Sequence, residues 1–123
     1  MTTKEIAERL VSLCRQGQFE TVHKELFATD AISIEPYATP TFPKETSGLN
    51  ALLEKGEKFT RLIEQVHAIS ISDPLVAGSS FACAMQLDVT IKGHGRMNLD
   101  ELCIYEVKDG KIVAEQFTSR FPV

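Results

Sequence analysis

Apolar side chains in the first half of the chain recur at the spacing of helices. Ile6, Leu10 and Leu13 form such a stripe, and Gly17 follows it, so the first two helices are expected to form a hairpin. Gly56 lies on the apolar stripe of the third helix, where a glycine suggests close approach to another element. The predicted helices are residues 4–15, 18–27 and 48–64.

The second half changes to the alternation that is typical of β-strands. Asp-Pro and glycine-containing turn signals separate the strands, which predicts an antiparallel meander. A shorter strand around residues 28–36 precedes a proline-rich loop over residues 37–47. Helices followed by a meander predict an α+β fold. The meander strands are expected at residues 66–72, 79–91, 95–107 and 111–121.

Alternation assigns the strand residues to two faces. In the predicted strand over residues 95–107, Glu101 and Asp100 take opposite faces. In the predicted strand over residues 111–121, Glu115 and Phe117 share one side. Hydrophobicity alone does not decide which face of these two strands points inward. In the predicted strand over residues 79–91, one face is expected to lie against the helices. This face consists of Phe81, Cys83, Met85, Leu87, Val89 and Ile91.

The segment "ISIEP" ends a short apolar strand on a carboxylate, Glu35, followed by Pro36. Glu35 either points to solvent or points into a cavity. In a cavity, burial would raise the pKa of its carboxyl group towards the operating pH, where a general base works best. The long loop that follows is of a length that often lines a site.

Composition excludes several function classes. The net charge of −4 argues against nucleic-acid binding, and 43% apolar with 24% charged residues is typical of one globular domain, expected over residues 1–123. No apolar run is long enough to span a membrane, and the N-terminus does not resemble a secretion signal. The three cysteines indicate free thiols in a reducing cytoplasm. No motif for a cofactor is present, and a metal site is not expected because His23, His67 and His94 are far apart, with His23 expected at the surface.

Two segments resemble the nuclear transport factor 2-like superfamily, in its SnoaL-like and ketosteroid isomerase-like branch. The segment "LFATDAISIEP" (26–36) is similar to the isomerase pattern in which the acid before the proline is the general base, which here is Glu35. The segment "DELCIYEVKDGKI" (100–112) is similar to the hairpin that carries a protonated acid. That position falls on Glu101 or Leu102, of which only Glu101 can donate a hydrogen bond.

The resemblance covers essentially the whole chain and implies a cone-shaped, curved antiparallel sheet packed against the N-terminal helices, also described as cystatin-like. It implies a pocket for a small apolar molecule, with Glu35 and Glu101 as candidate catalytic residues, no cofactor, and a homodimer through the convex face of the sheet. The isomerases carry a tyrosine donor on the first helix, and the matching position here is Leu10. The expected ligand-binding residues are Leu10, Tyr37, Phe59, Phe81, Met85, Leu99, Glu115 and Phe117.

Three functions therefore stay open from the sequence. The first is acid/base catalysis of the isomerase, cyclase or hydratase type. The second is a carrier that binds a small molecule without chemistry. The third is a dimerisation module whose cone is filled by side chains. Convergence of more than one acid on the same spot would favour catalysis over binding.

Overall fold

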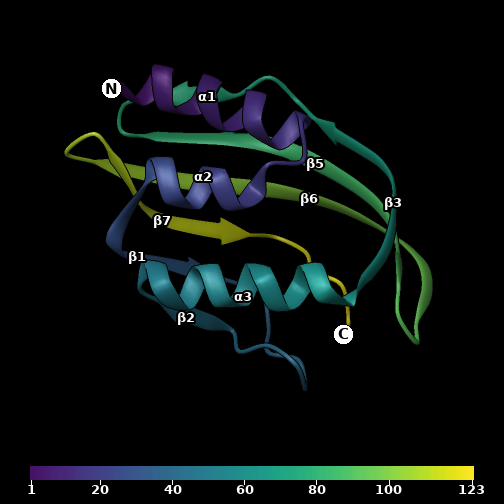
Figure 1. Cartoon of the computed structure of the whole chain (residues 1–123). Helices are drawn as coiled ribbons and strands as arrows, with labels where there is room; N and C mark the ends of the chain where they lie inside the picture. The colour runs from purple at the N-terminus through teal and green to yellow at the C-terminus, as the bar shows by residue number, and fades with distance from the viewer.

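The computed structural model describes residues 1–123 and contains three helices and seven strands (Figure 1). Their order along the chain matches the predicted sequence of helix hairpin, short strand, long helix and meander. The elements are α1 (Thr3–Arg15), α2 (Phe19–Leu26), β1 (Phe27–Ile34), β2 (Glu45–Ser47), α3 (Leu49–Leu62), β3 (Ile63–Ile71), β4 (Leu75–Ala77), β5 (Ser80–Ile91), β6 (Gly95–Lys108) and β7 (Lys111–Phe117).

The strands form one curved sheet in the order β2-β1-β7-β6-β5-β3, with β4 paired to β5. The pairs β3–β5, β5–β6 and β6–β7 are antiparallel, so the predicted meander is confirmed. The first strand, β1, pairs with the last, β7, in parallel. The predicted α+β class with a curved sheet is therefore confirmed, with one parallel pair that the sequence pattern did not indicate.

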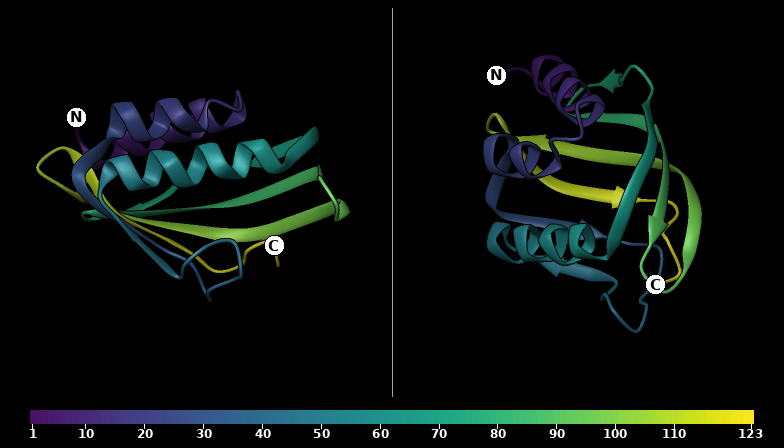
Figure 2. Two further views of the ribbon diagram at one scale, coloured as in Figure 1. Left: turned by 60° about the horizontal axis from the view of Figure 1, so that its bottom comes forward. Right: turned by 45° about the vertical axis from the view of Figure 1, so that its right-hand side comes forward.

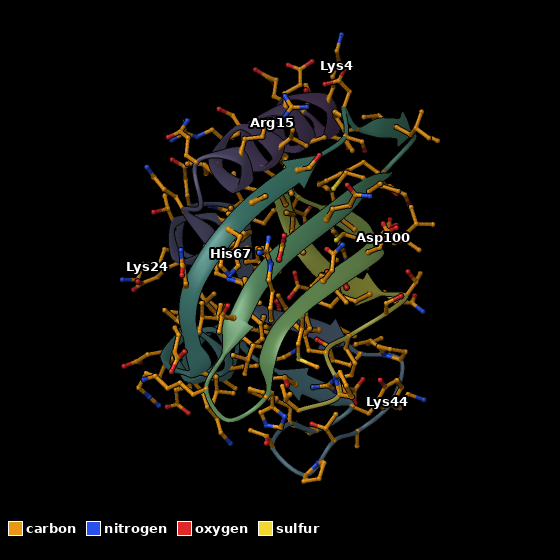
Figure 3. All side chains as sticks on the ribbon, turned by 90° about the vertical axis from the view of Figure 1, so that its right-hand side faces the viewer. Lys4, Arg15, Lys24, Lys44, His67 and Asp100 are labelled. Carbon is orange, nitrogen blue, oxygen red and sulfur yellow. The ribbon has the colours of Figure 1, made fainter.

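All three helices lie on one face of the sheet, and the other face carries none (Figure 2). Strand alternation follows this division, because Phe81, Cys83 and Leu87 of β5 are buried beneath the helices. In β6, Glu101 points inward and is buried, while Asp100 is exposed on the outer face (Figure 3). The helix-covered face is therefore the one that builds the core and any site.

Local signals fix the helix ends. Thr2 caps α1 in a capping box with Glu5, in which each side chain accepts the other's backbone N–H. Gly17 ends the helix with a φ of +72°, a conformation that favours glycine, and its N–H donates to the Cys14 carbonyl oxygen. Gly48 precedes α3 with a φ of +92°.

The structure differs from the predicted elements in the connections. The proline-rich loop contains β2, which pairs antiparallel with β1, and a short strand β4 precedes β5. The strand β3 begins directly after α3, and β7 ends at Phe117 and not at residue 121. After Phe117 the chain leaves the sheet, and its last residues fold inward so that Phe121 and Val123 are buried.

The buried apolar side chains form two clusters. The larger cluster lies between α1, α2 and the sheet and includes Ile6, Leu10 and Phe81. The smaller one gathers the far ends of β5 and the C-terminal residues, with the Phe59 ring stacked on Phe121 at 5.8 Å between ring centroids. No helix of the structure is long and apolar enough to cross a membrane.

Candidate functional site

A cavity of about 680 Å³ lies between the two apolar clusters. The helix α3 lines one side with Leu52, Lys55 and Phe59, and the inner face of the sheet lines the other. The C-terminal residues 119–121 and 123 close part of the wall. Small-molecule sites in proteins have volumes of roughly 300–1,000 Å³ and mostly apolar walls, so the cavity has the size and character of such a site.

Three buried carboxyl groups line this one cavity. Glu35 is 8% exposed, Glu101 is 6% exposed and Glu115 is 5% exposed. The strand register brings the three residues to neighbouring positions. Glu115 of β7 pairs with Ser33 of β1, two residues before Glu35. Phe117 of β7 pairs with Cys103 of β6, two residues after Glu101. Buried carboxyl groups are rare in proteins unless they are paired or functional.

Glu35 lies between two cations that the sequence did not predict. Its Oε1 accepts a hydrogen bond from Lys55 Nζ at 2.8 Å, and its Oε2 lies 3.9 Å from Arg120 Nε. Lys55 Nζ also donates to Ser33 Oγ at 3.3 Å. Glu35 therefore points into the cavity, one of its two expected orientations, and is paired there with opposite charge.

The raised pKa in this cavity belongs to Glu101. Burial is the largest cause, and the nearby charge of Glu35 adds to it, so that the pKa of the Glu101 carboxyl group rises to about 8. Glu115 and Cys83 raise the pKa further, while a hydrogen bond that the Cys103 thiol donates to Glu101 Oε1 at 3.7 Å opposes the shift. At neutral pH Glu101 is therefore mainly protonated and can donate a hydrogen bond.

Glu115 pairs with a histidine inside the cavity. His23 Nε2 lies 3.4 Å from Glu115 Oε1, and the His23 ring packs against Phe27 at 4.6 Å between centroids. His23 was expected at the surface, yet it lines the cavity, so that expectation is wrong. It lies one helical turn after Phe19, which also lines the cavity, and this spacing was the signal that could have placed it.

Glu115 reaches the inner face through an irregularity in β7. The register between β6 and β7 shifts between the pairs Glu106–Ala114 and Val107–Ile112, which leaves one extra residue in β7. As a consequence Ile112 and Glu115 are both buried. Strict alternation had placed them on opposite faces, and a β-bulge is the physical reason that both point inward.

Seven of the ten sequence-predicted site residues line the cavity. They are Glu35, Phe59, Met85, Leu99, Glu101, Glu115 and Phe117. The structure places the other three elsewhere. Leu10 is fully buried in the larger cluster, Phe81 stacks on the Tyr105 ring at 4.7 Å, and Tyr37 is exposed on the loop after β1. The first two fill the core, and so have no surface left to offer a ligand.

The chain offers no evident metal ligand set. Across residues 1–123, His, Cys, Asp and Glu side chains form no group of three or more that is placed to hold a metal ion. The polar groups of the cavity are instead arranged as acid–cation and acid–histidine pairs. This arrangement can take up and release protons.

Residues 1–119 match the family model described as the SnoaL-like domain, and the chain belongs to this family. Among solved structures, it is 35% identical to a Mesorhizobium loti protein described as a candidate SnoaL-like polyketide cyclase, with a TM-score of 0.87 over 95% of this chain and 98% of that one. A search of curated proteins found no match.

Two more distant structures share the fold. A Xanthomonas campestris protein with a cystatin-like fold is 20% identical, with a TM-score of 0.82 over 99% of this chain and 93% of that one. A nuclear transport factor 2-like protein from Burkholderia thailandensis is 12% identical, with a TM-score of 0.80 over 95% of this chain and 89% of that one. The resemblance to this superfamily that the sequence indicated is confirmed.

Proposed function

We propose that this protein binds a small, mostly apolar carbonyl compound in the cavity and catalyses proton transfer next to the carbonyl group. The reaction class is that of an isomerase, cyclase or hydratase without a cofactor. Glu35 acts as the base and Glu101 as the acid. The fold family is one that binds small molecules, and the apolar wall from Phe59, Met85 and Leu99 fits a ligand of this class.

The observation that carries the proposal is the difference between two carboxyl groups in one cavity. Glu35 is held next to Lys55 and Arg120, while Glu101 keeps its proton at neutral pH. Two titratable groups whose surroundings separate their protonation states provide an acid and a base at the same pH.

The proton moves in two steps. Glu35 removes a proton from the carbon next to the carbonyl group, the electron pair of the C–H bond forms a C=C bond, and the π pair of the C=O bond moves to the oxygen. The protonated Glu101 donates a hydrogen bond to that oxygen as it gains charge. Glu35 then returns its proton to another carbon of the substrate, or to the same one, and is ready for a further cycle.

The alternative is a carrier of the same ligand class without chemistry. In that case Lys55, Arg120 and Glu101 orient the polar end of the ligand. Glu35, Glu101 and Glu115 line one cavity, and the charges of Glu35 and Glu115 act on the Glu101 carboxyl group, which supports the catalytic function. The open cavity speaks against a module whose cone is filled by side chains.

Deuterium exchange tests the proposed function directly. The carbon-bound protons of small apolar ketones, beginning with 2-tetralone, are followed by proton NMR in D₂O with and without the protein. The wild type is expected to accelerate exchange, and Glu35→Gln is expected to lose about 10²-fold or more of that rate, a typical contribution of a general base.

Further variants test Glu101 and use its sequence neighbour Asp100 as a control. Glu101→Gln keeps an N–H donor and should retain more of the exchange rate than Glu101→Leu, which keeps none. Asp100→Asn changes the adjacent carboxyl group on the outer face and should leave the rate unchanged. Saturable ligand binding without exchange above the buffer rate would favour the carrier function instead.

We also propose that a second copy of the chain covers the outer face of the sheet. Three large apolar side chains are exposed there: Leu75 at 80%, Leu102 at 50% and Ile104 at 39%. The register makes them neighbours, because Ala82 of β5 pairs with both Leu75 and Ile104. An apolar surface on a helix-free sheet face is typical of an interface between protein chains.

A further inference from the structure

Arg120 is a buried cation at the cavity whose hydrogen-bonding capacity is only partly used. Its side chain is 7% exposed, and its Nη1 donates to the carbonyl oxygens of Tyr37 at 2.6 Å and Pro43 at 3.4 Å. Its Nε is sealed from solvent without a hydrogen-bond partner. Its Nη2 has no hydrogen-bond partner in the chain and is not sealed from solvent, and Arg120 is one of the residues that line the cavity.

The guanidinium group is held in a fixed position. The rings of Phe42 and Tyr37 lie 5.7 Å and 5.8 Å from it, on the loop that Nη1 also binds. A donor that is fixed before the reaction needs no reorganisation when charge develops nearby, and this is the property that makes such donors effective in catalysis. Arg120 therefore has a free donor and a rigid support at the cavity wall.

The charges around Arg120 change in a specific way when Glu35 accepts a proton. Before the transfer, the Glu35 carboxylate lies next to Lys55 and Arg120. After the transfer Glu35 is neutral, and the negative charge has moved to the substrate oxygen. Two cations that had faced a carboxylate then lie next to the new anion, and their attraction for it is stronger in a low-dielectric site than in water.

We propose that Arg120 is a further catalytic residue, whose Nη2 donates a hydrogen bond to the carbonyl oxygen of the substrate and stabilises the enolate. This inference rests on the proposed proton transfer. The C–H bond breaks, its proton goes to Glu35, and its electron pair becomes the enolate, which Arg120 and the O–H of Glu101 hold. When Glu35 returns the proton, the new C–H bond forms and the carbonyl group is restored.

The test uses 2-naphthol, whose ionised form resembles the enolate of 2-tetralone. The Glu35→Gln variant imitates the protonated base, and the absorbance of bound 2-naphthol reports whether it is ionised. If Arg120 contacts the oxygen, adding Arg120→Met to this background raises the pH at which bound 2-naphthol ionises by about one unit or more. An unchanged ionisation, or no saturable binding to Glu35→Gln, overturns the proposal.

A matched control is available in Lys58. Its Nζ donates to the carbonyl oxygen of Thr41 at 2.8 Å and lies 5.2 Å from the Phe42 ring centroid, so it supports the same loop as Arg120. It does not line the cavity. Lys58→Met in the same background should leave the ionisation of 2-naphthol unchanged. If it shifts the ionisation as much as Arg120→Met does, the role of Arg120 is only to hold the loop.

Exchange of 2-tetralone separates this inference from the proposed function. Arg120→Met is expected to lower the exchange rate by about 10²-fold, the usual loss when one oxyanion donor is removed. Exchange that persists in Arg120→Met overturns the inference and leaves the proposed function in place. A wild type that ionises 2-naphthol through Arg120 but exchanges no deuterium contradicts the proposed function instead.

Discussion

Glu101 and Asp100 are neighbours in the sequence with opposite surroundings. The two-residue period of β6 turns Glu101 into the cavity and Asp100 to solvent. Burial and the charge of Glu35 then raise the pKa of Glu101 to about 8. Strand alternation thus places a group that is protonated at neutral pH next to one that is exposed to solvent.

The pH dependence of stability follows from this shift. The unfolded chain ionises Glu101 above pH 4.5, its ordinary pKa, while the folded chain keeps the proton up to about pH 8. Glu101 therefore stabilises the fold fully below pH 4.5, and this contribution falls by about 1.4 kcal/mol per pH unit between these values. Across this window Glu101→Gln should gain stability relative to the wild type, as measured by urea unfolding. The free energy of unfolding of Asp100→Asn should change with pH as that of the wild type does. If the curve of Glu101→Gln also follows that of the wild type, the raised pKa of Glu101 is contradicted.

The ion pair of Lys55 and Glu35 makes a second prediction. Lys55→Met leaves a buried carboxylate without its closest cation, and we expect the free energy of unfolding at pH 7 to fall by about 2–4 kcal/mol. Adding Glu35→Gln removes the buried charge and should restore part of that loss. Urea unfolding of the single and double variants measures both effects. Equal stabilities for the two variants would show that the carboxylate is not buried as a charge.

The helices and strands of the meander follow from their periodic patterns, and the connections do not. The segment β2 has three residues and no apolar alternation, so its pairing with β1 depends on the tertiary structure. The alternation after Phe117 predicted a longer strand, because periodicity cannot show that a chain leaves the sheet. The same limit concealed Arg120, which lies in that segment.

The site was predictable only in part, because periodicity does not show how separate elements meet. Glu35, Glu101 and Glu115 follow from resemblance and strand alternation, but the bulge in β7 does not. Lys55 lies three residues after Leu52 and four before Phe59, and so on the apolar stripe of α3, but a lysine there is read first as a solvated residue. Its role became visible only when the strands had brought a carboxylate to it.

Gly56 lines the cavity at a position of α3 where glycine is less favourable for the helix than alanine. The expectation of close approach at this glycine is wrong, because a Cβ at this position would meet nothing within 4 Å. Gly56→Ala should raise the free energy of unfolding by about 1 kcal/mol, the helix preference of alanine, and should weaken 2-naphthol binding because Gly56 lines the cavity. Gly48→Ala, at a φ of +92°, should instead destabilise the fold. Binding of 2-naphthol that Gly56→Ala leaves unchanged would contradict the placement of the ligand in the cavity.

The two apolar clusters hold the molecule together on either side of the cavity. The larger one fixes α1 and α2 on the sheet, and the smaller one fixes the C-terminal residues that carry Arg120. The sheet therefore presents a built cavity on its inner face and an exposed apolar surface on its outer face. The proposed site and the proposed interface lie on opposite faces and can therefore be altered independently.

The proposed interface is testable at the scale of the whole molecule. Sedimentation equilibrium should give the mass of two chains for the wild type and of one chain for Leu102→Glu, because a charge within the outer apolar face opposes pairing. Lys4→Glu, on the exposed side of α1, is the control and should stay a dimer. A wild type with the mass of one chain at high concentration would refute the interface.

A titration of the carboxyl group of Glu101 by ¹³C NMR tests most directly whether the cavity holds a protonated acid at neutral pH. Protein labelled at the side-chain carboxyl carbon of glutamate is followed against pH, and the resonance that Glu101→Gln removes belongs to Glu101. This resonance is expected to keep the position of a protonated acid at neutral pH and to titrate at about pH 8. Titration near the ordinary value of 4.5 would mean that Glu101 is a carboxylate at neutral pH, unable to donate a hydrogen bond, and would contradict the acid–base pair on which the proposed function depends.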